Sequence, residues 1–105
     1  MRQFVVYRNR NKSTAGLYPF LVNVQSELIR DMETRVVIPL FRAPAERPPA
    51  PDGLSPLFKL DGEMFVLMTP MIASVDASVL GAEAHDLSAE RATIMAALDM
   101  LISGI

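Results

Sequence analysis

The sequence predicts a mainly β domain that ends in one α-helix, and three patterns carry this prediction. From Tyr18 to Val24, large apolar residues recur at every second position, which is typical of a half-buried strand. Asp61-Gly62 stands between two apolar runs and supplies the positive φ angles of a two-residue hairpin turn. From Ser88 onward the apolar spacing changes to that of a helix.

The bulk composition is that of one globular domain spanning residues 1–105. Half of the residues are hydrophobic and 21% are charged, which argues against disorder. The chain has no cysteine, and this excludes disulfides, thiolate metal sites and a cysteine nucleophile. The N-terminus lacks a secretion signal, and no stretch reaches the ~20 apolar residues that span a bilayer. We therefore expect a cytoplasmic protein that does not contact membranes.

The remaining β segments follow from β-branched and aromatic residues. In chain order they are Gln3–Tyr7, Thr34–Phe41, the hairpin strands Leu57–Leu60 and Glu63–Met68, and Ile72–Leu80, which bends near Asp76. Polar residues predict a turn over Arg8–Gly16 and a loop over Ser26–Glu33. Pro19 and Pro39 mark an edge or a bend. Residues 42–56 hold five of the eight prolines and predict a long loop.

The C-terminal helix is expected over residues 88–102, with Ser88 as its N-cap. One face is large and apolar and should cover the sheet: Ile94, Met95, Leu98, Leu101, Ile102 and Ile105. A second face is smaller and could meet a symmetry mate: Ala89, Ala92, Ala96, Ala97 and Met100. We therefore expect a homodimer with Ala97, Met100 and Leu101 at its interface, although which face forms the dimer stays open.

Residues that could carry catalysis are sparse. His85 is the only histidine and has no second imidazole or cysteine to complete a metal site, so we interpret it as structural or merely exposed. The acids of the C-terminal part, Glu83, Asp86, Glu90 and Asp99, form no recognisable acid/base pair. The seven methionines are interpreted as core filler. We therefore predict no catalytic residue, no metal and no cofactor.

The charges are distributed unevenly along the chain. Residues 1–47 hold eight of the ten Lys and Arg residues but only four of the twelve acids. This excess is too small for the chain to bind nucleic acid by itself. Arg8, Arg10 and Lys12 alternate in a polar turn, which is either a solvated hairpin tip or a docking patch for an acidic segment.

Several short segments, in a fixed order over nearly the whole chain, resemble those of one family. They are Val22-Asn23-Val24-Gln25-Ser26, Arg35-Val36-Val37-Ile38-Pro39-Leu40, Met68-Thr69, Ala73-Ser74-Val75, Asp86-Leu87-Ser88 and the terminal Gly104-Ile105. The chain resembles the CcdB toxins through these segments, from Phe4 to the last residue. The resemblance is weakest in the proline-rich stretch.

The resemblance implies an SH3-like barrel (CcdB/MazF-like) with a small additional sheet and one C-terminal α-helix. It implies a homodimeric toxin that binds the A subunit of DNA gyrase and traps the enzyme on cleaved DNA. It also implies a CcdA-type antitoxin, which neutralises the toxin and represses the operon together with it. The gyrase-binding residues carried over by position are Leu28, Ile29, Asp99, Ile102, Ser103, Gly104 and Ile105. The antitoxin-binding residues assigned by analogy are Arg8, Arg10, Lys12 and Arg42.

The helix tip departs from the best-known member of the family. That member has Trp at the position of Ser103, Phe at the position of Ile102 and a neutral Asn at the position of Asp99. Because aromatic anchors commonly dominate interface energy, a degenerate toxin that does not poison gyrase remains an alternative. A second alternative is a MazF/Kid-like endoribonuclease on the same barrel, with Arg35 or an acid near the sheet serving RNA cleavage.

Overall fold

The computed structural model describes residues 1–43 and 53–104, and this part of the chain forms seven strands and one α-helix. The strands are β1 (Val5–Asn9), β2 (Phe20–Asn23), β3 (Thr34–Arg42), β4 (Leu57–Leu60), β5 (Glu63–Leu67), β6 (Ala73–Asp76) and β7 (Leu80–Asp86). Helix α1 spans Arg91–Ser103. Short 3₁₀ turns at Thr69–Met71, Ala77–Val79 and Ser88–Glu90 precede β6, β7 and α1. The mainly β prediction with one C-terminal helix is confirmed.

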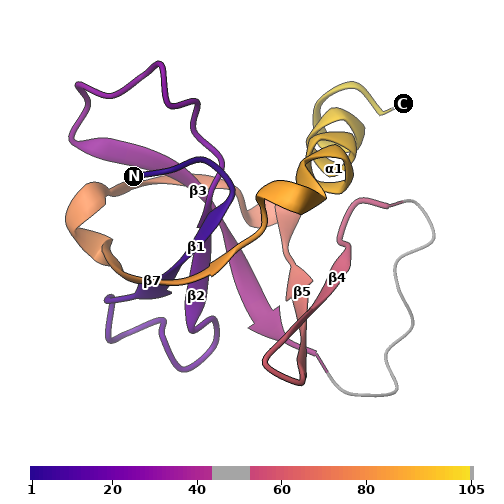
Figure 1. The fold of residues 1–105 in the computed structure, drawn as a ribbon, viewed down its shortest axis with the longest axis horizontal. Coiled ribbons are helices and arrows are strands. Elements are labelled where there is room, and N and C mark those ends of the chain that lie inside the picture. Colours follow the sequence, from indigo (N-terminus) through magenta and orange to yellow (C-terminus); the bar gives the residue numbers. More distant parts are fainter. Residues whose placement is uncertain (44–52, 105) are drawn as a thin grey trace.

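The strands form one antiparallel sheet in the order β4-β5-β3-β2-β1-β7, which curls into half a barrel (Figure 1). Along one edge β3 pairs with β2; along the other it pairs first with β6 and then with β5. The described strands contain no separate small sheet of the kind that the resemblance implies. The β4–β5 hairpin stands in its place and belongs to the same sheet through the pairing of β5 with β3.

Pro39 lies in the middle of this long strand, at the point where β3 changes partner. The pairing with β6 ends at Val37, and the pairing with β5 begins at Leu40. The Pro39 carbonyl accepts a hydrogen bond from the N–H of Met68 at 3.0 Å, on the side where β5 has just ended. Because no ladder bond is required of Pro39 nitrogen there, proline is tolerated in an otherwise central strand.

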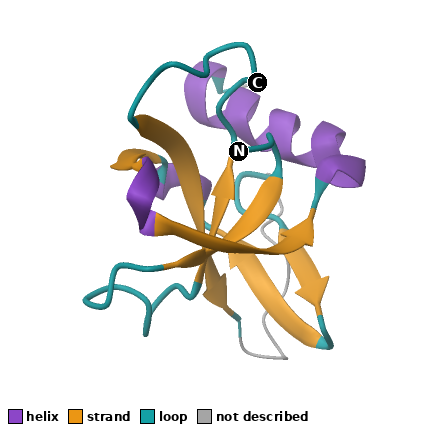
Figure 2. Ribbon diagram, turned by 60° about the vertical axis from the view of Figure 1, so that its left-hand side comes forward, coloured by secondary structure: helices purple, strands orange, loops and turns teal. Residues whose placement is uncertain are grey.

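Alternate residues of the central strands point to opposite faces of the sheet. Both faces are buried. One face, which includes Val6, Val22 and Ile38, packs against α1 through Ile94 and against the hairpin through Phe58 and other residues. The opposite face forms a smaller cluster of Val5, Tyr7, Leu21, Val37 and Leu80. Figure 2 shows α1 lying across one side of the curled sheet. The helix therefore completes the larger of two cores.

The helix differs at its start and along its apolar stripe from the sequence prediction. Ser88 is not the N-cap, because it opens a 3₁₀ turn and its N–H donates to Asp86 Oδ1 at 2.8 Å. Ile94 and Ala97 are buried, but Ile102 is 82% exposed and does not belong to the core stripe. Gly104 ends the helix as expected, with φ of +74° and its N–H bonded to the Met100 carbonyl at 3.0 Å.

Three other expectations need correction or lie outside the described residues. Strand β7 was not predicted beyond Leu80, because its small and charged residues show no apolar alternation and it pairs only with β1. Met95 packs against the larger core, but Met1, Met32 and Met71 are exposed, so the interpretation of the methionines as core filler is wrong for these three. In the predicted proline-rich loop, Arg42 belongs to β3 and residues 44–52 lie outside the described part of the chain. No helix among the described residues is long and apolar enough to cross a membrane.

The turn between β4 and β5 provides a first test of the fold. Gly62 has φ of +82°, a conformation that residues with a Cβ adopt only with strain. Gly62→Ala is therefore expected to lower the free energy of unfolding by about 1 kcal/mol in urea denaturation. Gly16→Ala is the matched control, since Gly16 has open space at its Cβ position and no positive φ. An equal loss in both variants would contradict the turn geometry.

The two isoleucines of α1 provide a second test. Ile94 is fully buried, so Ile94→Ala is expected to cost about 2–5 kcal/mol of stability. Ile102 is 82% exposed, so Ile102→Ala should change stability by less than about 0.5 kcal/mol. Chemical denaturation of both variants measures the difference. Similar losses at the two positions would mean that the helix packs through a different face.

Candidate interaction surfaces

His85 occupies a structural position between two parts of the sheet. Its Nε2 lies 3.2 Å from Asp61 Oδ2, and its ring meets the Phe20 ring edge-on with centroids 6.1 Å apart. The contact joins β7 to the turn between β4 and β5. Among residues 1–43 and 53–104, no three His, Asp or Glu side chains are grouped as metal ligands. The histidine therefore links two elements, which is the structural one of the two roles that the sequence left open.

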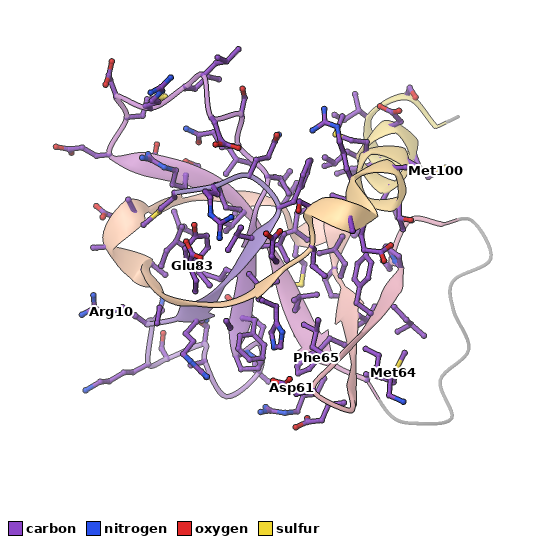
Figure 3. All side chains as sticks on the ribbon, viewed as in Figure 1. Arg10, Asp61, Met64, Phe65, Glu83 and Met100 are labelled. Atoms are coloured by element: carbon purple, nitrogen blue, oxygen red, sulfur yellow. The ribbon has the colours of Figure 1, made fainter. Side chains whose placement is uncertain are left out.

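A polar cluster joins the N-terminal residues to β7. Arg2 Nη2 lies 2.7 Å from Glu83 Oε1, and the Arg2 backbone N–H donates to Tyr7 Oη at 2.9 Å (Figure 3 labels Glu83). The hydrogen bond from Arg2 lowers the pKa of Glu83, and burial raises the pKa of Tyr7. Both pKa values are shifted away from neutral pH. A general acid or base works best with a pKa near the working pH. The cluster is suited to anchoring the N-terminus.

Arg35, the other residue considered for RNA cleavage, is engaged with the backbone. Its Nη1 donates to the carbonyl of Met32 and to that of Thr34, the latter at 2.8 Å. Its Nη2 lies 3.4 Å from the carbonyl of Arg30. A guanidinium that binds several neighbouring carbonyls has few donors left for a substrate phosphate. Arg35 therefore stabilises the loop before β3.

The C-terminal tip of α1 presents an apolar side chain to solvent. Ile102 is 82% exposed, and Asp99, Ser103 and Gly104 are exposed around it. The Ser103 hydroxyl donates to the Asp99 carbonyl at 2.7 Å, so its polar group is turned back onto the helix. Ile105 lies outside the described residues. The described positions assigned to the tip thus form one continuous patch on the last helical turn.

The loop between β2 and β3 carries the second part of the predicted surface. Leu28 is 86% exposed and Ile29 is 50% exposed. The Ile29 N–H donates to the Ser26 carbonyl at 3.0 Å, which closes a tight turn with Leu28 at its tip. In Figures 1 and 2 this loop and the C-terminal end of α1 both lie at the top of the view. Both segments can therefore be reached from the same end of the molecule.

Two exposed methionines extend this surface and were missed from sequence. Met1 is 49% exposed and Met32 is 53% exposed. Met32 stands between Asp31 and Glu33, and this charged context was the available signal that it does not belong to a core. A groove of about 270 Å³ separates the loop from the N-terminus. Its lining residues are Met1, Arg2, Asn23, Gln25, Ser26, Glu27, Ile29, Arg30 and Arg35.

The turn after β1 forms a basic surface. Arg8, Arg10 and Lys12 are exposed, and within the described part of the chain none of them pairs with an acid. The Arg10 N–H donates to the Val79 carbonyl at 2.9 Å, which places the turn against the start of β7. A Cβ at Gly81 would lie 3.0 Å from Arg10 Cγ, so glycine permits this close approach.

Arg42 joins the basic surface through a pair of aromatic rings. The Arg8 guanidinium lies 5.7 Å from the Phe20 ring centroid, and that of Arg42 lies 6.0 Å from the Phe65 ring centroid. The two rings are in edge contact, with centroids 5.3 Å apart. Arg42 Nε also lies 3.2 Å from Glu63 Oε2. The structure thus brings Arg8 and Arg42 over one aromatic platform, although they are far apart in sequence.

The predicted dimer residues on α1 fall into two groups. Ala97 is fully buried within the single chain, so its assignment to an interface is corrected: its side chain has no surface left for a partner. Met100 and Leu101 are half-buried and remain predictions. Figure 3 places Arg10 and Met100 on opposite sides of the molecule, so the basic turn and this helix surface are separate.

Comparison with protein families agrees with the geometry described above. Residues 3–104 of the 105-residue chain match the CcdB protein family. The match covers every described strand, the helix and the surfaces described here except Met1, Arg2 and Ile105. On this evidence the chain belongs to the CcdB family, a family of toxins from toxin–antitoxin systems.

Proposed function

We propose that this protein is a non-enzymatic toxin that binds the A subunit of DNA gyrase and traps the enzyme on cleaved DNA. The observation that carries the proposal is Ile102, an isoleucine that is 82% exposed on the last turn of α1 in a family of toxins. Leu28, which is 86% exposed, adds a second apolar side chain at the same end of the molecule. Exposed apolar side chains on segments that one partner can reach are typical of a surface that binds a protein.

The expected energetics follow from the residues present. Burying a large aliphatic side chain contributes roughly 1.5–3 kcal/mol, so Leu28 and Ile102 together can anchor a partner. Ser103 contributes no aromatic anchor, and its hydroxyl is bonded to the helix backbone. Asp99 adds a negative charge on the same turn, which favours a partner surface with a cation opposite it. The proposed interface is therefore aliphatic with one charged rim position.

The antitoxin is proposed to bind the basic surface formed by Arg8, Arg10, Lys12 and Arg42. Arg8 at the end of β1 and Arg10 and Lys12 in the turn support this, because none of them pairs with an acid within residues 1–43 and 53–104. The stacking of Arg8 and Arg42 over adjacent rings supports it as well. A stacked guanidinium can still bind a carboxylate through its edge, as Arg42 Nε does with Glu63 Oε2 at 3.2 Å. An acidic, extended segment of a CcdA-type antitoxin has the complementary chemistry. The same complex would repress the operon, with the antitoxin supplying the DNA contacts.

A homodimer is proposed to form through α1, with Met100 and Leu101 at its interface. These half-buried side chains lie on the helix next to the exposed alanines Ala92 and Ala96. Small side chains allow two helices to approach closely. A dimer would present two copies of the helix tip, one from each protomer.

A gyrase cleavage assay tests the proposed function. The wild-type protein is expected to increase linear DNA when gyrase acts on supercoiled plasmid, and Ile102→Ala should reduce this effect about tenfold or more, because an exposed anchor is removed. Thr93→Ala, exposed on the same helix but away from the tip, is the control. Absence of cleaved DNA with the wild type would point to a degenerate toxin. Specific cutting of RNA by the purified protein would favour the endoribonuclease alternative.

Antitoxin binding can be tested by removing the unpaired cations. The double variant Arg10→Ala, Lys12→Ala is expected to bind the antitoxin about tenfold more weakly and to show a smaller loss of affinity as salt is raised. Lys59→Ala, an exposed lysine on β4, is the matched control. Titration calorimetry at two salt concentrations measures both effects. Unchanged affinity and salt dependence in the double variant would place the antitoxin elsewhere.

A further inference from the structure

We infer that Gln25 is a positioning residue, which holds the turn carrying Leu28 and Ile29 in the orientation that a partner recognises. The inference rests on the proposed binding of gyrase by this turn. Gln25 itself is 8% exposed and therefore has little surface with which to contact a partner. Its role would be to act through the two exposed residues that follow it in the chain.

The loop between β2 and β3 has its apolar side chains on the outside. Leu28, Ile29 and Met32 are 86%, 50% and 53% exposed, so they contribute little packing against the core. On one side the loop borders the groove of about 270 Å³, which Ile29 and Arg30 help to line. Burial of apolar surface is the usual force that holds a loop in place, and it is weak here. The loop must therefore be held by hydrogen bonds.

Hydrogen bonds within the turn set its shape but do not attach it to the barrel. The Ile29 N–H donates to the Ser26 carbonyl at 3.0 Å, and the Leu28 N–H donates to Ser26 Oγ at 3.2 Å. These bonds join residues that are two or three positions apart. A turn closed only in this way could swing as a unit about its two ends.

The side-chain amide of Gln25 provides the missing attachment. Its Nε2 donates to the Ile29 carbonyl at 2.9 Å, and its Oε1 accepts from the Val36 N–H at 3.0 Å. Val36 lies on β3, which is the central strand of the sheet. One buried side chain thus connects the last residue of the turn to the barrel.

The amide also replaces a bond of the β2–β3 ladder at the point where the ladder ends. The Val24 N–H still donates to the Val36 carbonyl at 3.0 Å, but the Val24 carbonyl accepts from Gln3 Nε2 at 3.1 Å instead. The Val36 N–H, freed from its usual ladder partner, binds Gln25 Oε1. Gln25 therefore acts as an inserted peptide group, with one donor and one acceptor. Ionised Glu lacks the donor, Asn is shorter by one methylene, and Met has neither strong group.

Arg35 holds the other end of the same loop. Its guanidinium binds the carbonyls of Met32 and Thr34, and lies 3.4 Å from that of Arg30. Arg35 is only half-buried, however, and none of these carbonyls belongs to the Leu28–Ile29 turn. The turn itself depends on Gln25, which makes Gln25 the residue to substitute.

The test compares Gln25→Met with Gln3→Met. The Gln3 substitution removes the hydrogen bond to the Val24 carbonyl at the same ladder end and the one from Arg91 Nη1, and neither bond involves the turn. Gln25→Met is expected to weaken binding to purified gyrase A subunit by about tenfold or more, whereas Gln3→Met should change it less than about threefold. Gln25→Glu, which keeps an acceptor for the Val36 N–H but loses the donor to Ile29, should also lose about tenfold. Thermal unfolding of each variant identifies those that remain folded, and Gln25→Glu provides the measurement if Gln25→Met does not fold.

A double-mutant cycle separates positioning from general destabilisation. If Gln25 acts through Leu28, then Gln25→Met should have little further effect on gyrase affinity in a Leu28→Ala background. Full additivity of the two losses, or a folded Gln25→Met variant that binds gyrase as well as Gln3→Met does, would overturn the inference.

Different experimental results would contradict the proposed function and the positioning role of Gln25. If the wild-type protein does not bind the gyrase A subunit, the proposed function is wrong, and hydrogen exchange then tests the positioning role alone. The Ile29 amide, which is bonded to Ser26, should exchange about tenfold faster in Gln25→Met than in Gln3→Met. Equal exchange rates in the two variants would show that Gln25 does not hold the turn.

Discussion

Strand β3 is the element on which the rest of the structure depends, because it pairs with three other strands. It binds β2 along one edge and, along the other, β6 and then β5. The change of partner takes place at Pro39, where the absence of an N–H leaves no donor unsatisfied. Strand β3 therefore connects the hairpin, the barrel and the loop before Thr34 to one another. Each surface described above is attached to β3 directly or through one adjacent element.

The proposed gyrase surface reverses the usual distribution of side chains. At the loop after β2 and at the tip of α1, aliphatic residues face solvent while polar groups bond inward to the backbone. Gln25 binds Ile29 and Val36, and the Ser103 hydroxyl binds the Asp99 carbonyl. Hydrogen bonds thus fix the conformation of these two segments, whereas apolar packing fixes the elements of the core. Such an arrangement suits a toxin whose action is proposed to rest on surface complementarity, because the apolar groups stay available for a partner.

Local chemistry explains which elements were predictable. Asp61-Gly62 determines a tight turn by its backbone preferences alone, and both residues do have positive φ. Gly104 ends the helix for a similarly local reason. Strand β7 was missed because its pairing with β1 depends on a long-range contact, and its Gly81 is required by the close approach of the Arg10 side chain and the Arg8 carbonyl. Ile102 and the exposed methionines Met1, Met32 and Met71 were misjudged, because the apolar character of a side chain does not show whether the fold buries it.

The sequence by itself determined the class of the fold, the positions of the hairpin and the helix end, the absence of cysteine chemistry and, through several short segments in order, the family. These depend on residue type and on near neighbours in the chain. Only the tertiary structure decided that Arg8 and Arg42 share an aromatic platform, that Ala97 belongs to the core, and that Gln25 connects the exposed turn to β3. The first two depend on segments that the sheet or the docking of α1 brings together, and the third depends on where the β2–β3 ladder ends. No pattern in the sequence specifies where such groups meet.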